Sequence, residues 1–290
     1  MLIDTHAHLN FSAFDKDRDI LIEKCLKEDI WMINIGTNYE TSKKAIEIAK
    51  KYEKGVYASI GLHPINLDTG LIKIKNAKCK KQSPEDVLEK DFDYQEYKKL
   101  AHSTSSGQAC SKVVAIGEIG LDYYWKPKTT RKKELFKQKQ RTGLCQQLEL
   151  AKELNLPVIF HCRMAHQDLL KILNSRFQIL NSKIKGVMHG FVGTLEQLKE
   201  YLKMGFYIGF NGIIFKKIEG INFEENIKNT PLERILIETD CPYLAPPNFE
   251  ERNNPLGVKF VVQRIAEIKN INFEKVAEIT TKNAKELFKL

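Results

Sequence analysis

The sequence contains no apolar run that approaches the roughly 18 residues required to span a membrane. Its N-terminus also lacks the basic start, the apolar stretch and the small-residue cleavage site of a secretory signal, because acidic and polar residues begin at Asp4. These absences argue against a membrane-spanning or secreted protein. We therefore expect a cytoplasmic protein. The nucleus is the alternative location, but the sequence contains no clear basic localisation cluster that would support a nuclear location.

Closely spaced cysteine pairs are also missing. The six cysteines are Cys25, Cys79, Cys110, Cys145, Cys162 and Cys241, and none of them forms a Cys-x-x-Cys pair. Zinc fingers and disulfide frameworks require tighter, repeated spacing. We therefore expect free thiols in a reducing compartment and no separate zinc-finger module that reads nucleic-acid sequence.

Acidic residues are outnumbered by basic ones. The chain has 46 lysines and arginines against 37 aspartates and glutamates, which gives a formal net charge of +9. This excess favours a polyanionic partner such as nucleic acid. A lysine-rich solvated surface explains the same excess, because the sequence is generally rich in Lys, Ile and Asn.

Apolar, β-branched segments alternate with longer amphipathic segments along all 290 residues. Near-continuous apolarity suits strands that are buried on both faces, as in a parallel sheet. The predicted strands are 2–6, 30–35, 55–60, 112–117, 157–161, 185–189, 206–209 and 234–238. The helical patterns include 17–28, 39–52, 131–154 and 194–204, and two more, 257–269 and 273–289, close the chain.

Eight strands with a helix after most of them are typical of a (β/α)8 TIM-type barrel, an α/β fold. A doubly wound open sheet is the competing architecture. We predict a single domain over residues 1–290, because we find no internal repeat and no linker. Thr194 followed by Gln197 predicts a capping box at the start of one helix.

The segment 70–111 interrupts this regular alternation. It begins with five lysines between Lys73 and Lys81, continues with a helix-like acidic stretch from Pro84 to Leu100, and ends in turn-rich residues at 102–108. We predict an expanded βα connection on the barrel surface. Its lysines either contact a nucleic-acid backbone or form an ordinary solvated loop.

The first predicted strand carries Asp4, His6 and His8 at alternate positions. Side chains at alternate positions of a strand point the same way, so the two imidazoles should lie side by side. Two neutral imidazoles that converge on one point are typical metal ligands. A core strand whose histidines find hydrogen-bond partners would explain this short pattern equally well.

Ligand-type residues recur at the C-terminal ends of the predicted strands, where a barrel of this kind forms its active site. They are His6, His8, His63, Glu118, Asp122, His161, Arg163, His189, Glu238 and Asp240. Five of the seven histidines lie at such ends. His102 and His166 do not, and we predict surface or structural roles for both.

This set exceeds the three protein ligands and one water of a single catalytic zinc. Two adjacent ions would use the whole set if Glu118 bridges them. We place His6 and His8 on one ion and His161 and His189 on the other. Asp240 is the remaining predicted ligand and lies beside the water. Two ions about 3.5 to 4 Å apart suit phosphoester hydrolysis, because they stabilise both the attacking and the leaving oxygen.

Further roles follow from residue chemistry. Asp240 either accepts the proton of the attacking water or orients that water as a metal ligand. The candidate catalytic residues are Glu118, Asp240, His63 and Glu238. The candidate substrate-binding residues are Arg163, His63 and Asp122. Arg163 suits bidentate capture of a phosphate, and a buried salt bridge is the alternative role for it.

In chain order, the motifs are Asp4-x-His6-x-His8, Gly61-x-His63-Pro64, Gly117-Glu118-Ile119-Gly120-Leu121-Asp122, His161-x-Arg163, His189-x-Phe191, Glu238-Thr239-Asp240-x-Pro242-Tyr243-Leu244 and Arg252-Asn253-x-Pro255. Together they resemble the TatD family of metal-dependent deoxyribonucleases, over nearly the whole chain. The resemblance implies a barrel of the amidohydrolase type with a divalent-metal site of His6, His8, Glu118, His161, His189 and Asp240. It also implies hydrolysis of DNA supported by Mg²⁺ or Mn²⁺, often 3′ to 5′ on single strands, in DNA repair or degradation. Zn²⁺ is the alternative occupant of the site.

Two features depart from the family pattern. The stretch 71–111 is longer and richer in lysine than expected, which leaves its effect on substrate access open. Gly190 stands between His189 and Phe191, where Cys or Ser is commoner. Because this middle position is not a ligand, we expect the site to be kept.

Three alternatives stay open. The first is a hydrolase of small amides or esters on the same scaffold. Such enzymes often bridge two metals with a carbamylated lysine on the fourth strand. In this chain the fourth strand offers Glu118 and no lysine after Lys112. The second is deacylation of misacylated tRNA, and the third is a non-catalytic protein with a structural metal. For the nuclease we expect a monomer that binds DNA through its backbone with weak sequence specificity.

Overall fold

The structure is a computed structural model that describes residues 1–71, 83–103, 111–180, 184–250 and 252–290. The lysine run between Lys73 and Lys81 and most of the turn-rich stretch lie outside these ranges, as do Cys79 and Cys110. The other four cysteines are free thiols. In the ranges described, no helix combines the length and the apolar character needed to cross a membrane.

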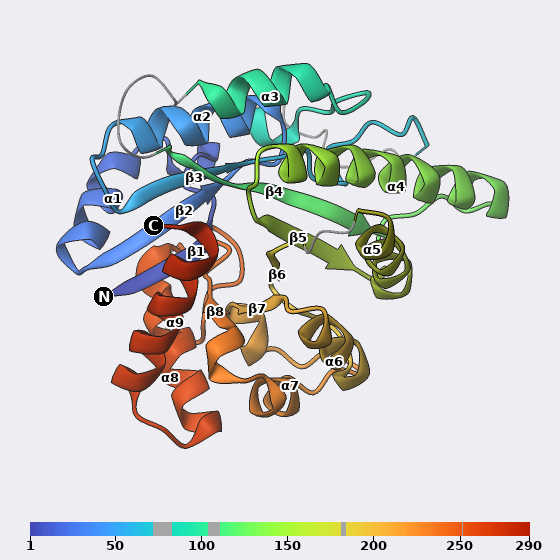
Figure 1. Cartoon of the computed structure of the whole chain (residues 1–290). Helices are drawn as coiled ribbons and strands as arrows, with labels where there is room; N and C mark the ends of the chain where they lie inside the picture. The colour runs from blue at the N-terminus through green and yellow to red at the C-terminus, as the bar shows by residue number, and fades with distance from the viewer. Residues whose placement is uncertain (72–82, 104–110, 181–183, 251) are drawn as a thin grey trace.

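Eight strands form one sheet in which each pairs with the next along the chain, always in parallel. Figure 1 shows this sheet curling around a central axis. The strands are β1 (Leu2–Ala7), β2 (Ile30–Ile35), β3 (Val56–Ile60), β4 (Val113–Asp122), β5 (Val158–Arg163), β6 (Gly186–Met188), β7 (Tyr207–Phe210) and β8 (Ile235–Ile237).

The sheet closes on itself between β1 and the residues that follow β8. The Asp240 amide donates to the His6 carbonyl oxygen at 2.8 Å, and the His8 amide donates to the Cys241 carbonyl oxygen at 3.0 Å. A parallel bridge between Ala7 and Cys241 lies between these two bonds. The predicted TIM-type barrel is therefore confirmed, and the open doubly wound sheet is excluded.

Helices cover the outside of the strands, as Figure 1 shows. They are α1 (Arg18–Lys27), α2 (Tyr39–Lys50), α3 (Tyr94–His102), α4 (Thr130–Glu153), α5 (His166–Leu180), α6 (Leu195–Lys203), α7 (Phe223–Asn229), α8 (Val258–Lys269) and α9 (Phe273–Phe288). Short 3-10 turns cover Ser12–Phe14, Pro84–Asp86, Gly212–Phe215, Leu232–Arg234 and Pro255–Gly257. The predicted capping box of Thr194 and Gln197 begins α6.

Two predicted boundaries differ from the structure by more than two residues. The fourth strand continues to Asp122, five residues beyond the predicted end, because Gly120 pairs with His161 and Asp122 pairs with Arg163 on the longer β5. The acidic stretch that begins at Pro84 is not one helix. Its only α-helix among the described residues starts at Tyr94, where the Asp93 side chain accepts from the Glu96 amide as an N-cap.

The strands bury both faces, as their composition predicted. Alternate residues such as Met32 and Ala58 pack outward against the helices. Their neighbours Ile33, Tyr57 and others form a separate apolar cluster with Phe288 at the end of α9. Because these two layers fix every strand from both sides, the strand ends form a rigid rim for the side chains described next.

Candidate metal centre

His6 and His8 converge at the end of β1, as their spacing predicted. Their Nε2 atoms lie 3.2 Å apart. The Nδ1 atom of His8 lies 3.2 Å from the Ile35 carbonyl oxygen, so this ring can donate through Nδ1 and present Nε2 to a ligand. Both side chains are buried.

Asp4 does not join the two histidines, contrary to the simple alternation. The register of β1 against β2 shifts between Asp4 and Ala7. The Asp4 carboxylate accepts bonds from the Thr239 amide at 3.0 Å, from the Thr239 hydroxyl and from the His6 amide. Burial raises the pKa of Asp4 to about 8 despite these bonds. Its role is to tie β1 to the segment after β8.

Glu118 occupies the middle of the cluster. Its Oε2 atom lies 3.3 Å from His6 Nε2, and its Oε1 atom lies 2.8 Å from His161 Nδ1. The same Oε1 atom is 3.4 Å from His63 Nε2 and 3.8 Å from His189 Nε2. Burial alone would raise the pKa of Glu118, but the surrounding imidazoles, His63 first, hold it well below its usual value. His8 Nε2 lies 4.0 Å from Oε2, so the group is a carboxylate shared by five rings.

Asp240 faces the same cluster from the end of β8. Its Oδ1 atom lies 3.3 Å from His8 Nε2, 3.8 Å from His6 Nε2 and 4.0 Å from His189 Nε2. The backbone at Asp240 has a φ of 56°, in the left-handed region. The side chain keeps 18% of its surface exposed, more than Glu118 with 5%. Asp240 is thus the carboxylate of the cluster that solvent reaches most easily.

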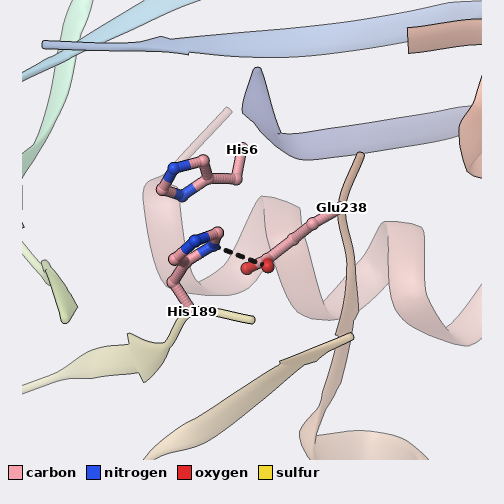
Figure 2. A group of neighbouring side chains, drawn as sticks. All are labelled: His6, His189 and Glu238. Carbon is pink, nitrogen blue, oxygen red and sulfur yellow. Dashed lines mark hydrogen bonds and ion pairs between the residues drawn. The ribbon is translucent and has the colours of Figure 1, made fainter. Parts of the chain in front are cut away.

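Glu238 lies behind His189 rather than in the open part of the site. Its Oε2 atom is 2.8 Å from His189 Nδ1, the contact that Figure 2 marks with a dashed line. The same atom accepts the Gly190 amide at 2.9 Å. The His189 ring stacks on the His6 ring with centroids 3.4 Å apart, which Figure 2 shows from the side. Because Glu238 is fully buried, it orients His189 and cannot contact a substrate directly.

Asp122 holds His161 in the same manner. Its Oδ2 atom lies 3.2 Å from His161 Nε2, and its Oδ1 atom accepts the Tyr124 amide at 2.9 Å. Burial opposes protonation of His161, but the bonds to Asp122 and Glu118 outweigh it and raise its pKa to about 9. Burial likewise opposes protonation of His189, whose pKa is raised to about 10 by Glu238 and Glu118.

Three donor groups in the described residues could each hold a metal ion. They are His6, His189 and Glu238; His6, His8 and Asp240; and His63, Glu118 and His161. Imidazole nitrogens with carboxylate oxygens suit Zn²⁺ and Mn²⁺, while carboxylates favour Mg²⁺. The stacked rings, the shared Glu118 carboxylate and the close approach of buried donors fit divalent cations at this position.

The remaining histidines and Arg163 lie around this cluster. His166 is buried, with Nδ1 3.0 Å from the Tyr201 hydroxyl and Nε2 2.9 Å from the Val192 carbonyl oxygen. His102 is exposed at the end of α3. Arg163 is exposed at the end of β5, and its guanidinium lies 3.6 Å from the centroid of the Tyr124 ring. A buried salt bridge is therefore not the role of Arg163.

One supporting residue was not identified from the sequence. A Cβ atom at Gly209 would lie 2.0 Å from Glu238 Oε1, so only glycine leaves room for this buried carboxylate. A glycine inside a strand often marks such a close approach, and Gly209 stands in the middle of β7. This is the signal that could have indicated it.

Comparison with known proteins identifies the family. A family model described as TatD related DNase matches residues 3–289. An uncharacterized metal-dependent hydrolase of Bacillus subtilis, YabD, is 38% identical over 295 residues, with 100% of both proteins covered. The 3'-5' ssDNA/RNA exonuclease TatD of Escherichia fergusonii is 30% identical, with 99% of this chain and 98% of that protein covered. The crystal structure of a TatD homologue from Escherichia coli matches with a TM-score of 0.79 and 27% identity, over 100% of this chain and 98% of the other. The chain therefore belongs to the TatD family.

Proposed function

We propose that the protein is a divalent-metal-dependent deoxyribonuclease that acts on single strands from the 3′ end, in the repair or degradation of DNA. The observation that carries this proposal is the position of Glu118, whose two oxygens lie within 4 Å of imidazoles from four strand ends. A carboxylate in this position is suited to bridge two cations. The relatives named as DNases or exonucleases and the net charge of +9 support a DNA substrate.

The proposed ligands are His6, His8, Glu118, His161, His189 and Asp240. Bound Mg²⁺ or Mn²⁺ ions, or Zn²⁺, would supply Lewis-acid activation of water and neutralise charge on the phosphodiester. His63 Nε2 lies as close to Glu118 as several of these ligands do. His63 is therefore either a further ligand or a donor to the phosphate.

Asp240 is the proposed general base. Its carboxylate is the most exposed of those that contact the clustered imidazoles directly, so it can accept the proton of an attacking water. Glu238 and Asp122 were predicted as catalytic and substrate-binding residues, but we now assign both as positioning residues. Each bonds a ring nitrogen of a proposed ligand, which fixes the tautomer and direction of that imidazole.

The rival hydrolase of small amides or esters finds less support in the geometry. The fourth strand, β4, carries Glu118 at the place where a carbamylated lysine would bridge two metals, and none of its ten residues is a lysine. The proposed ligands all come from one chain, so we also propose that the active species is a monomeric, single-domain protein. Sedimentation velocity at micromolar concentration tests that state.

The deciding experiment incubates the purified protein with single-stranded DNA labelled at either end, after EDTA treatment and after addition of Mg²⁺, Mn²⁺ or Zn²⁺. We expect cleavage only with a divalent ion, with mononucleotides released from the 3′ end. Glu118→Gln should abolish it, whereas Glu200→Gln on the exposed face of α6 should not. Metal-dependent hydrolysis of a small ester or of misacylated tRNA, without cleavage of DNA, would contradict the proposal.

A further inference from the structure

Two large aromatic side chains stand exposed beside the metal centre. Tyr124 and Trp125 lie two and three residues after the end of β4 and are 45% and 53% exposed. Their rings are perpendicular, with centroids 4.9 Å apart. Aromatic rings of this size are normally buried, so an exposed pair at the mouth of a site indicates a binding surface.

This pair connects to the metal centre through its neighbours. Trp125 lines a pocket together with Asp122, Pro64 and Gln140. Asp122 contacts His161, a proposed ligand, and also accepts the Tyr124 amide. Asp122 therefore links the two: it contacts the proposed ligand His161, and together with Trp125 it lines the pocket.

A dense basic segment continues from this point. Residues 126–141 contain eight lysines and arginines and a single acidic residue, Glu134. Lys126 and Lys128 are exposed just before α4, and Arg131 and Lys132 are exposed in its first turn. This helix is the long green one in Figure 1. No acidic side chain in the described part of the chain forms an ion pair with any of these four. Their charges are available to an anionic partner.

We propose that the Tyr124 and Trp125 rings and the basic residues at the start of α4 form a track for a single-stranded polynucleotide. A base next to the cleaved bond stacks on Trp125, and the following phosphates lie along Lys126, Lys128, Arg131 and Lys132. Stacking on aromatic rings combined with backbone charge is how single strands are bound without regard to sequence. We expect a duplex to bind less tightly, because the bases in its interior already stack on one another and offer no free face to the protein. This proposal rests on the proposed function and specifies the substrate of the same site.

A binding experiment without divalent ions tests the track independently of catalysis. The chain has two tryptophans, and Trp31 lies near the start of β2, at the opposite end of the barrel. In a Trp31→Phe variant, Trp125 is the only tryptophan. We expect its fluorescence to be quenched by DNA and RNA oligonucleotides of about 20 nucleotides, and not by an abasic oligonucleotide of equal charge. DNA and RNA strands in parallel show which of the two binds more tightly.

Variants separate the two parts of the track. Trp125→Ala should weaken binding of the oligonucleotide at least fivefold (about 1 kcal/mol), the lower end of the range for one stacked base. A plot of the logarithm of the association constant against the logarithm of the salt concentration has a negative slope. In Lys126→Ala/Arg131→Ala this slope should be less steep by about 1.4, as expected for two lost phosphate contacts. The matched control is Lys54→Ala/Lys282→Ala, which removes two exposed lysines before β3 and on α9, at the far end of the barrel.

Cleavage provides the second readout. In Trp125→Ala, the ratio of kcat/KM for the long strand to that for a dinucleotide should fall at least fivefold, about the contribution of one stacked base. An unquenched Trp125 together with an unchanged ratio would overturn the track. Quenching without cleavage of DNA or RNA by the parent protein would support the track and overturn the nuclease proposal. If Lys126→Ala/Arg131→Ala and Lys54→Ala/Lys282→Ala show the same dependence of binding on salt, the basic residues near the start of α4 do not contact the phosphates.

Discussion

Glu238 controls which nitrogen of His189 is available to the metal centre. Glu238 Oε2 lies 2.8 Å from His189 Nδ1, which places the Nδ1 proton between the two residues. His189 Nε2 then faces Glu118 Oε1 at 3.8 Å and becomes a metal donor once its proton is lost. The relationship is rigid because Glu238 is fully buried and also binds the Gly190 amide.

Glu238→Gln should weaken metal binding by about 10- to 100-fold, because the amide keeps the shape but loses the charge that orients the imidazole. Isothermal titration calorimetry with Mn²⁺ or Zn²⁺ measures the effect. Glu200→Gln, on the surface of α6, should leave the affinity unchanged. Equal affinities in the two variants would show that Glu238 does not position His189.

Gly209→Ala should destabilise the fold by about 1 to 3 kcal/mol, the range for overpacking in a core. Its Cβ would meet Glu238 Oε1 at 2.0 Å. Gly143→Ala is the matched control, since its Cβ would meet only Leu67 Cδ2 at 3.7 Å. This substitution within α4 should stabilise the fold by about 0.5 to 1 kcal/mol. Urea unfolding in EDTA measures both, and a neutral Gly209→Ala would contradict the close approach.

Metal affinity should rise with pH. In the metal-free protein the pKa values of His161 and His189 are raised to about 9 and about 10, so both rings are protonated at neutral pH. An imidazole must lose that proton before it can bind a metal, so the dissociation constant should fall between about pH 6 and about pH 9. Calorimetry in buffers of different ionisation enthalpy should detect the released protons, and His161→Asn should release fewer. A dissociation constant that is flat over this range would contradict the shifts.

Arg163→Lys should raise KM for a phosphodiester substrate by about tenfold and leave metal affinity unchanged, because lysine keeps the charge but not the planar guanidinium. Arg234→Lys is a close control. Arg234 also lies over a tyrosine ring, 5.0 Å from the centroid of Tyr207, but before β8 at the other end of the barrel. If both variants behave alike, Arg163 does not bind the phosphate.

The barrel could be predicted because each buried strand carries its own signal in the sequence. An apolar segment such as Ile30–Ile35 must be covered on both faces, and the alternation with helices leaves few ways to do so. The order of the strands also brings their C-terminal ends to one rim. That is sufficient to place His6 and Asp240 near each other, although 234 positions separate them in the sequence.

The contacts between ligands and their supporting residues could not be predicted in this way. Glu238 and Asp240 both follow β8, and the sequence does not show that one is buried behind His189 while the other faces solvent. The direction of each carboxylate depends on space left by other strands, as Gly209 leaves it on β7. The register of β1 against β2 shifts between Asp4 and Ala7, and Asp4 binds Thr239 instead of joining the cluster. The alternation of residues in β1 alone does not show this.

The closure of the barrel has a consequence during protein synthesis. The amide of Asp240 and the carbonyl of His6 meet only when the last strand docks beside the first one. A nascent chain that is still emerging from the ribosome has residues 6 and 8 outside the tunnel long before residue 240 is made. The donor set is then incomplete, so we expect unfinished copies of this protein to be inactive.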